Sequence, residues 1–266
     1  MIKLILFLSS FTIMMATQNF AQDFDFSKVK SCSPKKKIPH SKKLLKDLTW
    51  LNFEPTQITS ADIFTIQNIN EKHKTTDITF IGHNTYLANC AGYNREAISK
   101  KLSLSLRQGL SCLSHLNRHR RKDAAILLSF LDSRYSSPLV IRCELNGANE
   151  YMGRDTYPGW DNEKTINGIA SAFVCTNNLY PSAIFSKWKL NKIISAENTD
   201  EASTFFHELL HLLGYLHMDK DFDSWGYDFV YQVIGCCFPN SINRELNPVM
   251  DLEHSCNRLK KMRRRI

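Results

Sequence analysis

Apolar residues recur at helical spacing along one long stretch in the first half of the chain. The members of this stretch are Ile98, Leu102, Leu106, Leu110 and Leu113. They follow one another at intervals of four and three residues, so a helix places them on one face. We therefore predict a long helix from Glu96 to about Asn117. A second helix is predicted from Asp123 to Leu131, with the charged stretch 118–122 as a corner between the two.

Short apolar runs elsewhere predict strands. These runs are Ile78–Ile81, Leu139–Cys143, Ile169–Cys175 and Ala183–Leu190. In the last run, Lys187 and Lys189 alternate with apolar residues, which is typical of an exposed sheet edge, although the solvated face of a two-layer sheet gives the same alternation. Helices and short strands are mixed within one domain, so the expected fold class is α+β.

The first residues of the chain form a leader. Lys3 precedes an apolar run that continues to Ala16, with serines at positions 9 and 10 interrupting it. A positive charge followed by a short apolar core is typical of a secretory signal peptide, and the run is too short for an ordinary membrane span. We expect residues 1–21 to be a signal peptide, with an uncleaved anchor as the alternative. Residues 22–75 form a basic, lysine-rich segment, for which a pro-segment is one interpretation.

All eight cysteines follow this leader. They are Cys32, Cys90, Cys112, Cys143, Cys175, Cys236, Cys237 and Cys256. An even number of cysteines in an exported chain predicts disulfides, up to four here, because the compartment is oxidising. Cys236 and Cys237 are adjacent, so we expect them to bond to different partners. A zinc–thiolate site is the alternative, but the chain has no Cys-x-x-Cys pair.

The most informative stretch reads HELLHLLGYLH and begins at His207. His207 and His211 are four residues apart, so on a helix they share a face and can reach one metal ion together. Glu208 follows the first of them, where its carboxylate can lie beside a water molecule at the metal. Gly214 can end the helix in the left-handed conformation, after which His217 can return as a third ligand. Three protein nitrogens leave a fourth position open, which is typical of a catalytic zinc site.

The stretch resembles the extended HExxHxxGxxH motif of the metzincin metallopeptidases. That clan also has a methionine-containing turn, for which Met250 in Asn-Pro-Val-Met is the counterpart here. The resemblance implies a twisted, mainly parallel sheet with an edge strand, an active-site helix and a small C-terminal subdomain. It also makes residues 76–266 the catalytic domain. Met218 after the motif matches no large subfamily, and Leu252 stands where some subfamilies have a zinc-contacting tyrosine, so the similarity is at the level of the clan.

The function that this implies is that of a secreted metalloendopeptidase, extracellular or periplasmic, with Zn²⁺ as its cofactor. Glu208 would act as the general base that takes a proton from the attacking water. An exposed strand upstream of the motif, 169–175 or 183–190, would align an extended peptide by strand addition. The alternatives are a zinc amidohydrolase acting on cell-wall peptide linkages and a non-catalytic secreted binding protein that zinc stabilises. Glu208 disfavours the second, because a structural site needs no carboxylate beside the metal.

The formal net charge of +8 is unevenly distributed. Residues 197–228 hold eight acids and one base, whereas basic residues gather at 35–46, 118–122 and 260–265. A nucleic-acid binder would have its basic residues around the functional surface, and here that surface is acidic. We therefore expect a peptide or protein substrate, no specific nucleic acid, no transmembrane span and a monomer.

An acidic run and the remaining histidines offer two other possible metal-binding patterns. Asp219, Asp221 and Asp223 resemble the start of a calcium loop, but Ser224 and Val230 stand where an EF-hand has glycine and glutamate. An aspartate in place of His217 on the zinc stays open as an alternative. The other histidines show no metal spacing and are expected to be surface or core residues. They are His40, His73, His83, His115, His119 and His254.

Overall fold

The computed structural model describes the central part of the chain with several gaps. The described residues are 45–56, 60–144, 171–174, 180–197, 202–213, 215, 229–240 and 252–262. The predicted signal peptide lies outside them, as do residues 22–44 and 57–59 of the basic N-terminal segment. Among the described helices, we find none with the length and apolar character that a membrane span requires.

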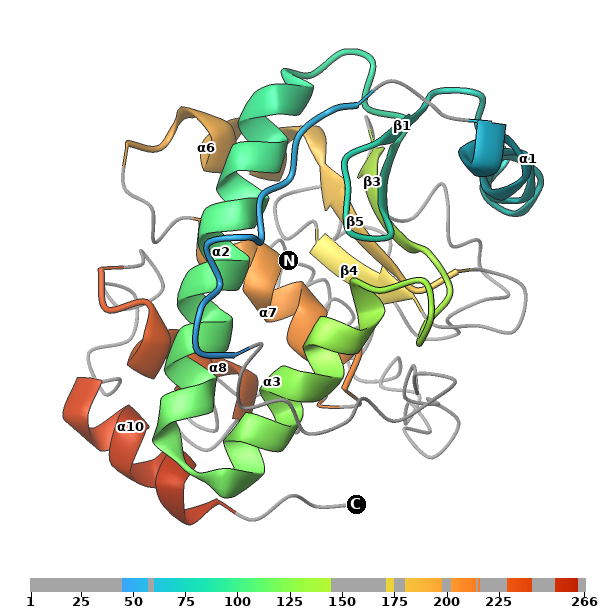
Figure 1. Ribbon diagram of the computed structural model, residues 1–266. Helices are drawn as coiled ribbons and strands as arrows, with labels where there is room; N and C mark the ends of the chain where they lie inside the picture. Colours follow the sequence, from blue (N-terminus) through green and yellow to red (C-terminus); the bar gives the residue numbers. More distant parts are fainter. Residues whose placement is uncertain are drawn as a thin grey trace, which may run out of the picture.

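A five-stranded mixed sheet forms the upper part of the molecule in Figure 1. The strands are β1 Ile78–Phe80, β2 Thr85–Ala88, β3 Leu139–Glu144, β4 Ser171–Val174 and β5 Ser182–Ser186. Their order across the sheet is β1-β2-β3-β5-β4. The three central strands are parallel, whereas β1 and β4 pair antiparallel with their neighbours at the two edges. The expectation of a mainly parallel sheet therefore holds only for its centre.

Helices make up most of the rest of the described chain. They are α1 Ser60–His73, α2 Arg95–Leu116, α3 Arg118–Phe130, α6 Lys187–Ser195, α7 Ser203–His211, α8 Phe229–Cys237 and α10 Leu252–Lys261. The long helix α2 runs down the molecule and contacts α3, α7 and α8 (Figure 1). Helices and strands packed in this way confirm the predicted α+β class.

The predicted long helix is confirmed, and its apolar face forms the centre of the core. Ile98, Leu102, Leu106, Leu110 and Leu113 are all buried in the main hydrophobic cluster. The Asn94 side chain accepts a hydrogen bond from the backbone N–H of Ala97 and caps the start of α2. Five large side chains in one stripe hold α2 against the helices and strands around it, as the spacing predicts.

The second predicted helix begins earlier than expected. α3 starts at Arg118, because the Asn117 side chain caps it through the backbone N–H of Arg120. The stretch 118–122 is therefore helical and not a corner. Arg120 within it is fully buried.

The strand predicted over 183–190 is wrong in its second half. β5 ends at Ser186, and Lys187 to Leu190 open α6. Leu190 and Ile193, three residues apart, are both fully buried, so a helical period begins where lysines and apolar residues alternate in the sequence. The four-residue strand β2 was not predicted. It follows a turn in which Gly82, His83 and Asn84 all have positive φ.

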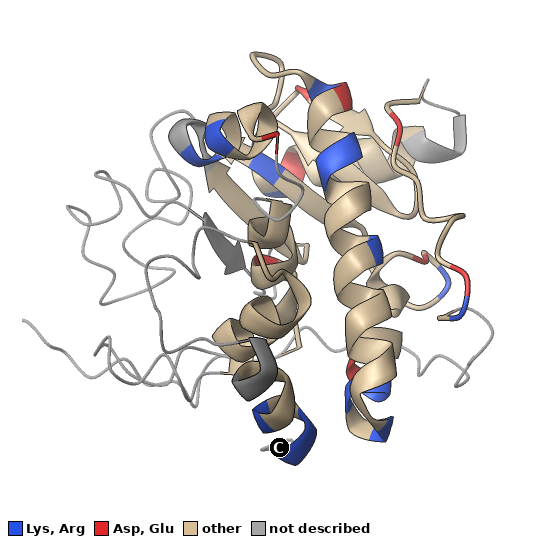
Figure 2. Ribbon diagram, turned by 90° about the vertical axis from the view of Figure 1, so that its left-hand side faces the viewer, with Lys and Arg blue, Asp and Glu red and all other residues tan. Residues whose placement is uncertain are grey.

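Basic side chains gather at the lower end of the molecule. The end of α10 and the start of α3 both carry them, and Figure 2 shows the two groups at the same end. The Asn117 side-chain amide donates to the Lys260 carbonyl at 3.1 Å and joins the two helices there. Of the eight acids between 197 and 228, the described residues include Glu197 and Glu208. Most of the acidic stretch therefore lies outside the described residues.

α7 is held from two sides by adjacent phenylalanines. Phe205 meets Phe185 of β5 edge to face, with ring centroids 4.8 Å apart. Phe206 lies against α2 at Gly109, where an added Cβ would be 2.5 Å from three of its ring carbons. The Phe206 ring also packs against Phe238, at 5.7 Å. Gly109 therefore permits the close approach of α2 and α7.

We predict that Gly109→Ala destabilises the protein by about 1–2 kcal/mol. Overpacking of a filled core costs about 1–3 kcal/mol, and the better helix propensity of alanine returns at most about 1 kcal/mol. Urea unfolding followed by circular dichroism measures the change. Gly92→Ala is the matched control, because an added Cβ there meets nothing within 4 Å. Equal stability of the two variants would contradict the close approach of α2 and α7.

Candidate metal site

The two histidines and the glutamate of the motif lie on α7 in the described part of the chain. His207 is half-buried. Glu208 and His211 are buried, each with an exposed fraction of 4%. The imidazole ring centroids of His207 and His211 are 5.1 Å apart, and their planes are inclined by 75°. The predicted helix and the shared face of the two histidines are therefore confirmed.

His211 is oriented by a backbone carbonyl just beyond the helix. Its Nδ1 atom forms a hydrogen bond with the carbonyl oxygen of Tyr215. Because a carbonyl oxygen can only accept, Nδ1 carries the proton and donates it. Nε2 is then the unprotonated nitrogen, which is the one that would coordinate a metal ion. Metal-binding histidines usually donate their second nitrogen to a carbonyl or carboxylate in this way, so His211 fits a zinc ligand.

Glu208 lies beside the Nε2 atom of His207. Its Oε1 atom is 3.9 Å from His207 Nε2. The carboxylate is also nearly buried, so it is partly shielded from bulk water. A carboxylate in this position can accept a proton from a water molecule at the metal. The arrangement is therefore compatible with general-base chemistry.

Two aromatic residues at this site were not predicted. The Tyr231 ring of α8 lies edge to face with His207, at a centroid distance of 5.3 Å. Tyr215 supplies the carbonyl that binds His211, and its ring stacks on Phe229 at 3.7 Å. The sequence shows no signal for Tyr231, because it lies two dozen residues along the chain from His207. Tyr215 falls inside the motif, but every residue has a backbone carbonyl, so the sequence does not indicate that this one binds His211.

The remaining residues predicted for the site lie outside the described residues. These are His217, Gly214 and Met250. The third ligand, the helix-ending glycine and the methionine turn therefore stay predictions.

At its N-terminal end, α7 has Ala202 at the N-cap position, without a side-chain cap hydrogen bond.

Two other histidines of the described chain, His73 and His83, pack on rings that lie outside α7. Burial, together with the positive charges of Arg142 and Lys72, lowers the pKa of His73 to about 4. Its ring stacks with Tyr180. Burial also lowers the pKa of His83, which packs edge to face on two aromatic rings. His73 is a fully buried, neutral histidine at pH 7 and His83 is half-buried, in agreement with the interpretation from sequence.

Six of the eight cysteines form three disulfides in the described residues. They pair Cys90 with Cys143, Cys112 with Cys237, and Cys236 with Cys256. The adjacent cysteines have different partners, as predicted. Cys32 and Cys175 lie outside the described residues.

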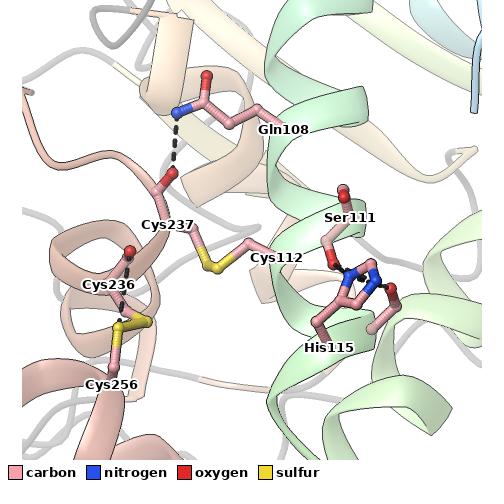
Figure 3. The surroundings of a disulfide bond; sticks show 8 residues. Gln108, Ser111, Cys112, His115, Cys236, Cys237 and Cys256 are labelled. Atoms are coloured by element: carbon pink, nitrogen blue, oxygen red, sulfur yellow. Dashed lines mark hydrogen bonds between the residues drawn. A yellow bond between two sulfur atoms is a disulfide. The ribbon is translucent and has the colours of Figure 1, made fainter.

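Three sulfur atoms come close enough together to be considered as a metal cluster. The Sγ atoms of Cys112, Cys236 and Cys237 lie within 4.8 Å of one another. Figure 3 shows that two disulfides meet here, side by side. A disulfide sulfur carries no thiolate charge, and the thiolate is the form that binds metals. The proximity therefore reflects two neighbouring crosslinks, and the zinc–thiolate alternative loses its best candidate.

We predict that replacing Cys112 and Cys237 together by alanine lowers stability by about 2–5 kcal/mol, as loss of a native disulfide does. The zinc content of the purified protein, measured by atomic emission, should not change. The matched control replaces Cys90 and Cys143, which form a disulfide away from the sulfur cluster. Loss of zinc from the first variant alone would show that the cysteine cluster binds the metal.

Comparisons with known proteins do not place the chain in a family. No family model, no curated protein and no solved structure matches it. The motif and the geometry of α7 are therefore the features that point to a function.

Proposed function

We propose that this protein is a secreted zinc-dependent metalloendopeptidase of metzincin-like fold. The observation that carries the proposal is the hydrogen bond from His211 Nδ1 to the Tyr215 carbonyl. This hydrogen bond fixes His211, which lies next to His207 on the helix, in the tautomer that a zinc ligand has. His207 and His211, with His217 as the third ligand, would hold the ion.

The nature of these ligands selects the metal and the kind of chemistry. Imidazole nitrogens suit zinc, and three of them leave one coordination position for substrate or water. A zinc ion bound there supplies a Lewis acid that polarises the scissile carbonyl and activates water. Glu208 takes the proton of the attacking water and passes it to the nitrogen of the leaving amine.

The burial of Glu208 supports this role. Its carboxylate is nearly enclosed, next to His207 Nε2, and it lies on a helix fixed by Phe205 and Phe206. A base held in one place needs no reorganisation at the moment of proton transfer. A structural zinc site has no use for a carboxylate there, so the geometry favours an enzyme over a zinc-stabilised binding protein.

The sheet offers an edge for the substrate beside α7. β4 is the outer strand on the side of β5 and contacts α7. β5 has neighbours on both sides, whereas β4 pairs with a strand on one side only among the described residues. An extended peptide added to β4 would pass close to the metal helix. This position favours a peptide substrate.

The secreted location is supported by the disulfides. Three crosslinks in the described chain fit an oxidising compartment. The predicted signal peptide supports the same location. A cell-wall peptide linkage, cleaved by the same chemistry, is the second candidate substrate for an exported enzyme with this site.

We predict that Glu208→Gln abolishes hydrolysis and keeps the zinc. Glutamine retains the shape of the side chain but cannot accept a proton, so the rate should fall about 100- to 10,000-fold. Mass spectrometry of a complex peptide mixture measures cleavage, and atomic emission measures bound zinc. His211→Ala should lose both zinc and activity.

Glu71→Gln makes the same chemical change on the exposed surface of α1 and is the matched control. Full activity in Glu208→Gln would refute the role of the base. Zinc binding by the wild-type protein without cleavage of peptides, but with release of cell-wall peptides, would favour the amidohydrolase. Zinc binding with neither activity would favour a binding protein.

We also predict that methylation of the substrate backbone shows the pattern of a strand. A strand directs successive N–H groups to opposite sides, so N-methylation at alternate residues should remove a hydrogen bond to β4. Each such loss should lower kcat/KM by about fivefold, and the intervening positions should be far less sensitive. A cleaved peptide methylated at one position at a time provides the test. Indifference at every position would exclude strand addition.

A further inference from the structure

A fully buried arginine lies at the junction of α3, Tyr215 and α10. Arg120 is the largest side chain without solvent exposure in the described chain. Its Nη1 donates to Asp123 Oδ2 at 2.8 Å and to the Tyr215 hydroxyl at 3.0 Å. Its Nη2 donates to the Met262 carbonyl at 2.7 Å, and its Nε to the Leu259 carbonyl at 3.4 Å. The guanidinium also lies over the Phe229 ring, 4.4 Å from its centroid.

Stability alone does not account for this ion pair. Arg120 and Asp123 are both buried, with side chains 0% and 1% exposed. Removing two charges from water costs several kcal/mol per ion, and apolar packing of similar volume is often as stable. A buried pair of this kind is most useful where it holds another group in one geometry. The group that it holds here is Tyr215.

Tyr215 is fixed at both of its ends. Its hydroxyl accepts a hydrogen bond from Arg120 and donates one to Asp123 Oδ2 at 3.1 Å. Its ring stacks on Phe229, with the planes inclined by 25°. Its backbone carbonyl accepts the hydrogen bond from His211 Nδ1. A residue anchored through ring and hydroxyl has little freedom to move its carbonyl.

The same arginine reaches the C-terminal helix. The carbonyls of Leu259 and Met262 lie at the end of α10, and Arg120 binds both. The disulfide between Cys236 and Cys256 attaches α10 to α8. The end of α10, α3 and the segment after α7 therefore meet at one charged side chain.

We propose that Arg120 and Asp123 are positioning residues for the metal site. They hold the Tyr215 side chain, so that its carbonyl keeps the His211 imidazole with Nε2 presented to the metal ion. This inference rests on the proposed zinc site, and it assigns to that site a support on α3 that the motif does not contain. Residues 95 positions apart are thereby joined in one metal-orienting network.

The test is the Tyr215→Phe variant, which removes the hydroxyl and leaves the ring on Phe229. Loss of an outer partner of a metal ligand weakens metal binding by about 10- to 100-fold, and we expect about tenfold because the backbone carbonyl itself remains. Competition with a chromophoric chelator at fixed pH measures the zinc dissociation constant. The visible absorption of the cobalt-substituted protein should change in position or intensity, because the ligand field depends on the orientation of His211.

Tyr93→Phe is the matched control. It removes one hydroxyl from a tyrosine that packs on the same core cluster, just before α2. Its zinc affinity and cobalt spectrum should equal those of the wild type, whatever its melting temperature. Tyr215→Leu, which also removes the stack on Phe229, should weaken zinc binding further than Tyr215→Phe. If the leucine variant does not fold, the phenylalanine variant decides.

The outcomes separate this inference from the proposed function. A wild-type zinc affinity and cobalt spectrum in Tyr215→Phe would overturn the positioning role and leave the peptidase proposal intact. Weakened zinc in Tyr215→Phe, in a protein that cleaves no peptide, would support the positioning role and refute the peptidase. A wild-type protein that binds no zinc would overturn both.

Discussion

The packing of α7 against α2 and β5 is the contact on which the site depends. α7 has nine residues, and a helix of that length is marginal in water without tertiary contacts. Phe205, Phe206 and Leu210 are fully buried, and each such side chain contributes about 1.5–3 kcal/mol through the removal of apolar surface from water. The same contacts fix the polar face of the helix. His207, Glu208 and His211 therefore have one position relative to the sheet.

A disulfide and a buried arginine connect α2 and α3, which lie beside this helix, to the C-terminal part of the chain. The Cys112–Cys237 disulfide joins α2 to the end of α8 across 125 residues, and Gln108 donates to the Cys237 carbonyl beside it at 2.8 Å. A crosslink that closes a long loop removes much of the freedom of the unfolded chain. The buried guanidinium of Arg120 acts at a second point, on α10. Together they hold α2, α8 and α10 in one arrangement around α7.

This arrangement meets the needs of hydrolysis at a metal. The base must be close to the metal and partly shielded from water, and the ligands must be oriented before the ion binds. In the proposed enzyme, Glu208 would meet the first need and the His211–Tyr215 hydrogen bond would meet the second. The outer edge of β4, which has no partner strand among the residues that the structure describes, adds a surface on which a peptide backbone could be recognised without regard to its side chains. The proposed peptidase uses all three features.

The spacing of residues in the sequence was enough to determine the features that depend on residues close together in the chain. The buried stripe of α2, the shared face of His207 and His211, and the different partners of the adjacent cysteines all follow from neighbours within a few residues. Tertiary structure decided the rest: that the lysine-rich end of the predicted edge strand is α6, that Arg120 is buried, and that a tyrosine carbonyl orients His211. These depend on groups such as Arg120 and Tyr215, which lie 95 residues apart. Periodicity carries no information across such a distance, because only the folded chain brings the two groups into contact.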